Sequence, residues 1–130
     1  MRTKSGLAWT GYWLIAVAVL HTIASGIFFG DVFIRMWQKG LFNSVGRDPM
    51  IGLAVWFLLF GPVIAMLGAA ITRLEKVGDF NTSNKLAWSI LLLSIVGVIL
   101  MPGSGFWLAF PPALSLIYRS FTPSPARTSS

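Results

Sequence analysis

The stretch AWTGYWLIAVAVLHTIASGIFFG, residues 8–30, decides the fold, because it contains no acidic residue, lysine or arginine. A helix of about 20 apolar residues, rising 1.5 Å per residue, crosses a hydrocarbon core of roughly 30 Å. Arg2 and Lys4 precede the stretch, and its first residues include two tryptophans and a tyrosine, as at a membrane interface. A signal-peptide cleavage site at residues 16–18 would leave an apolar core of only about nine residues. We therefore expect a permanent membrane-spanning helix.

The composition extends this expectation to the whole chain. Hydrophobic residues make up 55% of the 130 residues and charged residues 11%, with a mean hydropathy of +0.76. A water-soluble domain of this size would lack the polar surface to cover itself. The absence of cysteine excludes disulfides, thiolate catalysis, iron–sulfur clusters and zinc–thiolate sites. The net charge of +6 comes from basic residues scattered over connectors, which membrane topology explains better than nucleic-acid binding.

The sequence predicts an all-α fold, an integral membrane four-helix bundle formed by one domain over residues 1–130. A short interfacial helix is expected after the first span, in DVFIRMWQKGLF from Asp31, and Asp48 is expected to cap the second span. Pro62 predicts a kink near Gly61. A hydrophilic connector is expected over residues 73–85 and a tight turn over residues 102–105. The four spans are expected at about 8–30, 50–72, 86–101 and 106–118.

Small residues four apart predict which spans touch, because they let two helix backbones approach closely. Two such series occur in the first and second spans, and we expect them to face each other. They are Ala18, Thr22 and Gly26 in the first span and Gly61, Ala65 and Ala69 in the second.

The distribution of basic residues predicts the orientation. Seven lie in the two termini and the 73–85 connector, three lie in the 31–49 interval, and none lies in the 102–105 turn. Because basic residues are enriched on the cytoplasmic side, both termini are expected to be cytoplasmic.

Four stretches of the chain resemble a known family. They are HTIASGIFFG from His21, GLFNSVGRDP from Gly40, AVWFLLFGPVIAMLG from Ala54 and VILMPGSGFWLAFPPAL from Val98. The chain is similar to an uncharacterised family of small bacterial four-helix membrane proteins, domain of unknown function 6463. That family has a histidine in the first span, an FLLFG-type element in the second and an SGFW element after the third, here His21, residues 56–62 and residues 104–107. The resemblance implies a bacterial inner-membrane protein and no particular activity.

His21, the single histidine, is the first candidate for chemistry. An ionisable group deep in a span is costly and usually faces the bundle interior. It is interpreted either as a functional group that binds a ligand or carries a proton, or as a neutral histidine hydrogen-bonded between helices. Haem is an alternative, although one histidine supplies one axial bond per chain, and no metal site is expected since catalytic zinc needs about three protein ligands. The tentative ligand-binding residues are His21, Trp13, Ser25, Trp56, Phe57, Phe60, Ser104 and Trp107.

A second candidate is a polar cluster on the expected outer face. It could fold over the open end of the bundle as a lid, with Ser104 and Trp107 on the same side, or its members could be interface anchors and loop ion pairs. The sequence places all four acids in connectors, which argues against a proton-coupled transporter, since that class needs a membrane-buried acid. The cluster consists of Asp31, Arg35, Asn43, Arg47 and Asp48.

These observations leave two classes of function. In the first, the protein binds a lipid or small apolar molecule near His21, which predicts an enclosed pocket there. A membrane enzyme that uses His21 as acid or base, for example an isomerase, extends this hypothesis. In the second, it is an interaction subunit whose small-residue faces pair with another copy or another membrane protein. No cofactor is evident, and the expected partners are membrane lipids, a small apolar molecule, or a protein chain.

Overall fold

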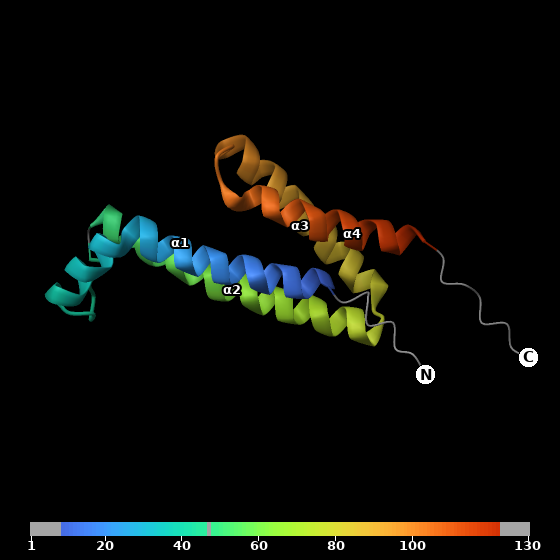
Figure 1. Cartoon of the computed structure of the whole chain (residues 1–130), viewed down its shortest axis with the longest axis horizontal. Coiled ribbons are helices and arrows are strands. Elements are labelled where there is room, and N and C mark those ends of the chain that lie inside the picture. The colour runs from blue at the N-terminus through green and yellow to red at the C-terminus, as the bar shows by residue number, and fades with distance from the viewer. Residues whose placement is uncertain (1–8, 47, 123–130) are drawn as a thin grey trace, which may run out of the picture.

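The computed structural model describes residues 9–46 and 48–122, and these residues contain helices and no strand (Figure 1). The expected all-α class is therefore confirmed. Arg2, Lys4, Arg47 and Arg127, which contribute to the predicted orientation, lie outside the described residues. The elements are α1 (Trp9–Lys39), α2 (Pro49–Val77), α3 (Phe80–Leu100), the 3₁₀ helix η1 (Gly105–Ala109) and α4 (Phe110–Phe121).

Three helices, α1, α2 and α3, are long and apolar enough to cross a membrane. α4 has only 12 residues, because Pro111 and Pro112 mark its first turn and the chain before them is the five-residue η1. The expected span 106–118 is therefore two elements rather than one. Together η1 and α4 reach about 28 Å, which approaches the thickness of a hydrocarbon core.

Helix ends follow local capping chemistry. The Asp48 carboxylate accepts hydrogen bonds from the backbone N–H of Met50 and Ile51, as expected for an N-cap. Asp79 caps α3 in the same way by accepting from the Thr82 backbone N–H at 3.0 Å. The Thr82 side chain and backbone together lower the pKa of the Asp79 carboxyl from its ordinary value.

Residues 31–39 continue α1, which ends before Gly40 at φ 91°. Their position along the membrane interface stays a prediction. Another expected boundary is wrong. The hydrophilic connector over residues 73–85 shrinks to Gly78 and Asp79, because α2 and α3 extend into it from both sides. Polar residues can occupy a helix once it leaves the hydrocarbon, so a drop in hydropathy marks the edge of a membrane more reliably than the end of a helix.

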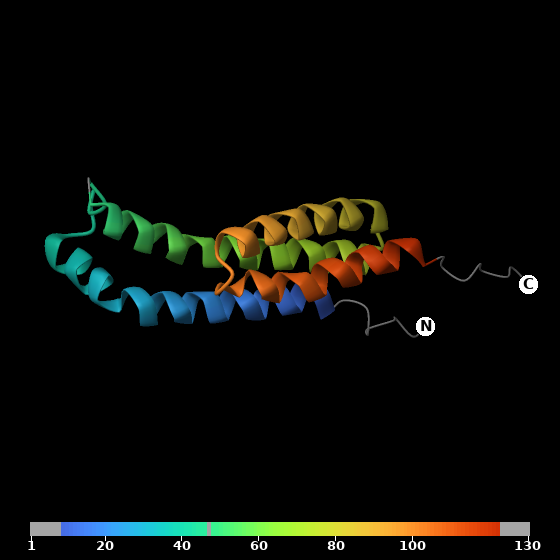
Figure 2. The same ribbon diagram turned by 90° about the horizontal axis from the view of Figure 1, so that it is seen from above.

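The helices form two antiparallel hairpins, α1 with α2 and α3 with α4. Figure 1 shows the second hairpin diverging from the first toward its turn, and Figure 2 shows that turn level with the middle of α1. The start of α1, the α2–α3 link and the end of α4 lie at one end of the molecule (Figure 1). The far half of the α1–α2 hairpin therefore extends beyond α3 and α4.

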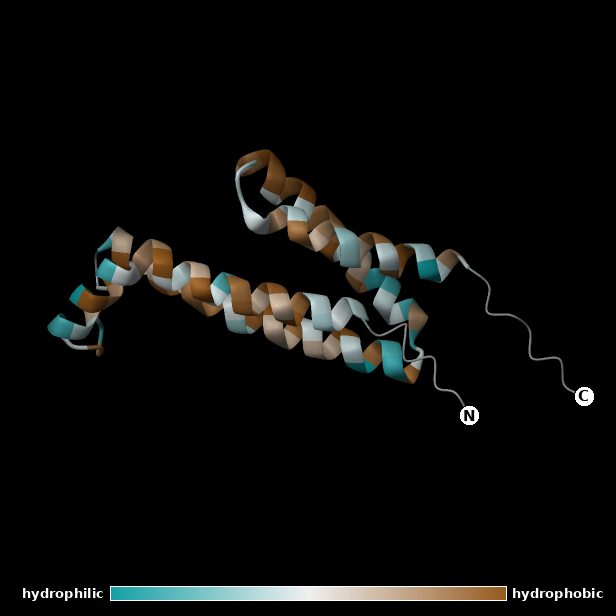
Figure 3. Ribbon diagram, viewed as in Figure 1, coloured by the Kyte–Doolittle hydropathy of each residue, from teal (hydrophilic) through white to brown (hydrophobic). Residues whose placement is uncertain are grey.

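Two small cores hold the hairpins. The larger lies where all four helices meet and includes Leu14, Ile71, Ala87 and Leu116. The smaller joins Val32 of α1 to Ile51 and Ala54 of α2. Most large apolar side chains are exposed instead, and Figure 3 shows hydrophobic residues along the helix bodies, with hydrophilic ones gathered mainly at the hairpin ends. This distribution suits a chain whose solvent is lipid.

Close backbone approach sets the α1–α2 contact. A Cβ placed on Gly61 would lie 2.6 Å from the Thr22 Oγ1 and 3.6 Å from the Ala18 carbonyl oxygen, so the expected pairing of these three residues is confirmed. The rest of the prediction is wrong at two places. A Cβ on Gly26 would meet nothing within 4 Å, and Ala69 is exposed. The two helices approach closely a second time, where Gly68 of α2 faces Gly11 of α1. Which residues meet depends on the angle at which the helices cross, and a four-residue spacing within one helix does not determine it.

Candidate functional site

His21 lies on α1 about 18 Å along the helix axis from Trp9. Its Nε2 is 2.8 Å from the backbone oxygen of Phe57 on α2. The imidazole also stacks on the Phe57 ring, with centroids 4.2 Å apart and planes 19° apart, and the Phe60 ring lies 6.1 Å away. Three of the predicted ligand-binding residues are thus brought together at one point of the α1–α2 contact.

The Phe57 carbonyl fixes the tautomer of His21. A carbonyl oxygen has two lone pairs, so it can accept from His21 in addition to its bond within the helix. Because the oxygen only accepts, Nε2 must donate, and in the neutral ring Nδ1 is then an acceptor. Within residues 9–46 and 48–122, Nδ1 has no hydrogen-bond partner and is not among the buried unpaired atoms. The site therefore presents one open acceptor at the surface of the helix pair.

Ser25 follows His21 by one helical turn on the buried side of α1. The residue is fully buried, and its hydroxyl has no hydrogen-bond partner in the described part of the chain. Thr22, between them in sequence, satisfies its own hydroxyl by donating to the Ala18 carbonyl at 2.9 Å. Ser25 is thus close to His21 along the helix but enclosed between α1 and α2.

The other predicted ligand-binding residues lie elsewhere. Trp56 is 74% exposed. The Trp13 indole donates to the Leu108 carbonyl at 2.8 Å and so joins α1 to η1. Ser104 accepts from the Phe106 backbone N–H at 3.4 Å, and the Trp107 indole donates to the Pro102 carbonyl at 2.9 Å. Trp13, Ser104 and Trp107 therefore stabilise the α3–α4 hairpin and its contact with α1, and the structure does not bring them to His21.

The predicted outer-face cluster lies at the far end of the α1–α2 hairpin. Asp31 and Arg35 are exposed on α1, Asn43 adopts a left-handed φ of 53° in the following loop, and Asp48 is occupied as the cap of α2. Arg47 is outside the described residues. Ser104 and Trp107 do not share this end, because their turn is level with the middle of α1 (Figure 2).

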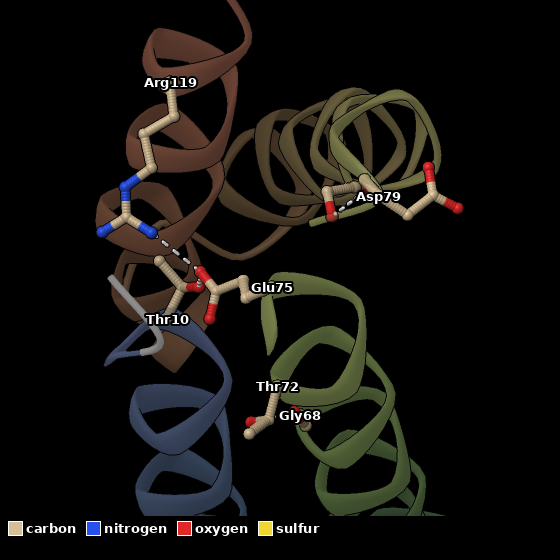
Figure 4. Close-up of polar contacts among 7 residues, drawn as sticks. Thr10, Gly68, Thr72, Glu75, Asp79 and Arg119 are labelled. Carbon is tan, nitrogen blue, oxygen red and sulfur yellow. Dashed lines mark hydrogen bonds and ion pairs between the residues drawn. The ribbon is translucent and has the colours of Figure 1, made fainter. Parts of the chain in front are cut away.

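A polar cluster that the sequence did not predict ties three helices together at the opposite end. Glu75 of α2 accepts hydrogen bonds from the Thr10 hydroxyl of α1 and from the Arg119 guanidinium of α4, the latter at 2.9 Å (Figure 4). The Glu75 side chain is only 4% exposed. The expectation that all acids lie in connectors is therefore wrong for Glu75, and also for Asp31, which is inside α1.

A signal for this cluster was present in the sequence. Gly68, Thr72 and Glu75 follow one another at spacings of four and three, so they share a face of α2. Gly68 and Thr72 are buried, and the Thr72 hydroxyl donates to the Gly68 carbonyl at 2.8 Å (Figure 4). Extending the buried face of Gly68 and Thr72 by one helical turn would have predicted that Glu75 is buried as well. The arginine that meets it comes from α4, and no local pattern identifies it.

A pocket of about 300 Å³ lies between the start of α3 and the end of α4. It is lined by Phe80, Asn81, Asn84, Ser120 and Phe121. It is not the pocket expected at His21, since neither α1 nor α2 contributes to its lining. In the part of the chain that the structure describes, no three histidine or acidic side chains lie together as metal ligands.

Comparison with known proteins gives one match. The model of a family of unknown function, DUF6463, matches residues 6–123. No curated protein and no solved structure matches the chain.

Proposed function

Because the chain belongs to the DUF6463 family, whose function is unknown, we propose its function from geometry: it binds a lipid or small apolar molecule on the α1–α2 hairpin beside His21. The observation that carries this proposal is the open Nδ1 of His21. An unpaired polar group in hydrocarbon is costly, so such an acceptor calls for a partner from outside the chain.

The surroundings of His21 suit an apolar ligand. Phe57 holds the imidazole by its carbonyl and its ring, and Phe60, at 42% exposure, extends the aromatic surface outward. No lysine, arginine or acidic residue occurs in the helix segments 9–30 and 50–72 on either side. A bound molecule would therefore meet aromatic and aliphatic side chains and a single polar atom, the pattern of a small-molecule site.

Native mass spectrometry of the protein in lipid nanodiscs tests this proposal. The wild-type chain should retain a defined small molecule from the membrane extract, and His21→Leu, which removes Nδ1 and leaves no acceptor in its place, should retain markedly less of it. Ser89→Ala serves as the matched control, because the Ser89 hydroxyl bonds only within α3, to the Lys85 carbonyl. Equal retention by wild type and His21→Leu, or a bare chain in both, would contradict the proposal.

A second candidate, an interaction subunit, is favoured by a different observation. Gly26 and Gly30 lie four apart on α1, and a Cβ on either would meet nothing within 4 Å. Small residues at that spacing allow a second transmembrane helix to approach. Gly26→Leu should then convert an oligomer into a monomer without unfolding the chain. A wild-type protein that is already monomeric in nanodiscs would refute this candidate.

We further propose that the protein lies in a bacterial inner membrane with both termini cytoplasmic. The support is the excess of basic residues in the termini and the 73–85 segment over the 31–49 interval. The common position of the start of α1 and the end of α4 agrees with an even number of crossings (Figure 1).

A further inference from the structure

The His21 site also constrains the chemistry of its ligand. Nε2 is engaged by the Phe57 carbonyl, so the neutral ring can offer a ligand only the lone pair of Nδ1. A lone pair accepts a hydrogen bond and cannot donate one. The group that satisfies it must therefore carry an O–H or N–H.

The lack of charged residues near His21 also limits the charge that a ligand can carry. Along α1 the closest acidic residue is Asp31, about 15 Å from His21 along the axis. The described ion pair, Glu75 with Arg119, lies near the C-terminal end of α2, where Glu75 Oε1 also accepts from Thr10. A phosphate, carboxylate or ammonium at His21 would thus be buried without a counter-charge, at a high cost in free energy.

From these two constraints we infer that the ligand is a neutral amphiphile whose single hydroxyl lies within an otherwise apolar body and donates to His21 Nδ1. The inference rests on the proposed binding function and specifies its ligand class. A phospholipid does not meet it, because its polar head belongs at the interface and not deep in the hydrocarbon. The hydroxyl gives orientation, while contacts with Phe57, Phe60 and neighbouring aliphatic side chains supply most of the affinity.

The single histidine makes the test specific. Selective ¹⁵N-histidine labelling gives the two nitrogens of one residue, so the spectrum of the full chain in nanodiscs reports on His21 alone. Three probes of equal length are titrated: a sixteen-carbon secondary alcohol with a mid-chain hydroxyl, the ketone of the same skeleton, and the plain alkane. Binding is measured independently as probe adducts by native mass spectrometry.

The alcohol should move the Nδ1 resonance saturably and bind about fivefold more tightly than the ketone, as one net hydrogen bond predicts. The ketone and alkane should leave Nδ1 unchanged. In His21→Leu, which offers no acceptor, the preference for alcohol over ketone should vanish while all three probes still bind.

The outcomes separate the two proposals. If the three probes bind equally and Nδ1 does not move, the ligand class is overturned and the binding function stands. If none forms an adduct with a folded wild-type chain, the binding function itself fails. If the ketone binds more tightly than the alcohol, the site offers a donor and the assignment of Nδ1 as its open acceptor is overturned.

Discussion

Gly68→Ala should destabilise the protein, although alanine is the better helix former. The new Cβ would lie 2.7 Å from the Gly11 backbone oxygen, whereas ordinary van der Waals contact begins near 3.4 Å. It would also lie 3.1 Å from the Ile15 backbone nitrogen. Neither atom can rotate away, so α1 and α2 must separate by about 0.7 Å and lose close packing along the contact.

The magnitude follows from two opposing terms. Overpacking costs about 1–3 kcal/mol, and the gain in helix propensity from glycine to alanine returns about 1 kcal/mol. The net expectation is a loss of about 0–2 kcal/mol in the free energy of unfolding. The control is Gly52→Ala in the same helix, where the nearest atom is the flexible Val45 Cγ1 at 3.5 Å. It should be neutral or stabilise by about 0.5–1 kcal/mol.

The assay is reversible unfolding in mixed micelles, with tryptophan fluorescence measured against the mole fraction of SDS. Opposite shifts of the two midpoints would support the close approach at Gly68. Equal stabilisation by both alanines would refute it, because a helix pair with room for a Cβ at Gly68 would not have the α1–α2 spacing described here.

Three further predictions concern other parts of the chain. Arg119→Met should lower the free energy of unfolding by about 3 kcal/mol, because it leaves the buried Glu75 carboxylate without its cation. The pKa of the Asp79 carboxyl is lowered, so the stability that its cap contributes should be complete above pH 3.8, the ordinary pKa, and be lost as the pH falls below that value. Thermal unfolding of Asp79→Asn should lack this pH dependence. In this cysteine-free chain, a membrane-impermeant maleimide added outside intact cells should label Asn43→Cys and spare Asn81→Cys.

Each has a distinct failure. For the ion pair, the control is Arg73→Met, because Arg73 is exposed on α2 and its loss should change the free energy of unfolding by less than about 0.5 kcal/mol. Equal destabilisation by Arg73→Met and Arg119→Met would contradict the buried ion pair. For the cap, an unchanged pH profile in the Asp79 variant would contradict the assignment. For the orientation, the reverse labelling pattern would place the termini outside.

The sequence predicted those features that local chemistry determines. The apolar stretch from residue 9 predicted α1, Asp48 predicted the cap of α2, and Gly61 predicted the contact with Ala18 and Thr22. Each depends on composition or on spacing within one helix. Hydropathy did not predict where α1 ends, since its last turns carry polar residues that a helix tolerates outside the hydrocarbon.

The features that were missed depend on how separate helices are placed. Glu75 becomes buried only because α1 and α4 both approach the end of α2, and Arg119 is 44 residues away in sequence. Ser104 and Trp107 were expected on the same side as the outer-face polar cluster. The offset between the two hairpins, which no single-helix pattern encodes, puts them elsewhere (Figure 2).

The ligand site depends on His21 donating to the Phe57 carbonyl and keeping Nδ1 open. The most direct measurement is a ¹⁵N spectrum of the labelled, ligand-free protein in nanodiscs, which identifies the protonated nitrogen of this one histidine. We expect a proton on Nε2 and an unprotonated Nδ1. A proton on Nδ1 would contradict this assignment.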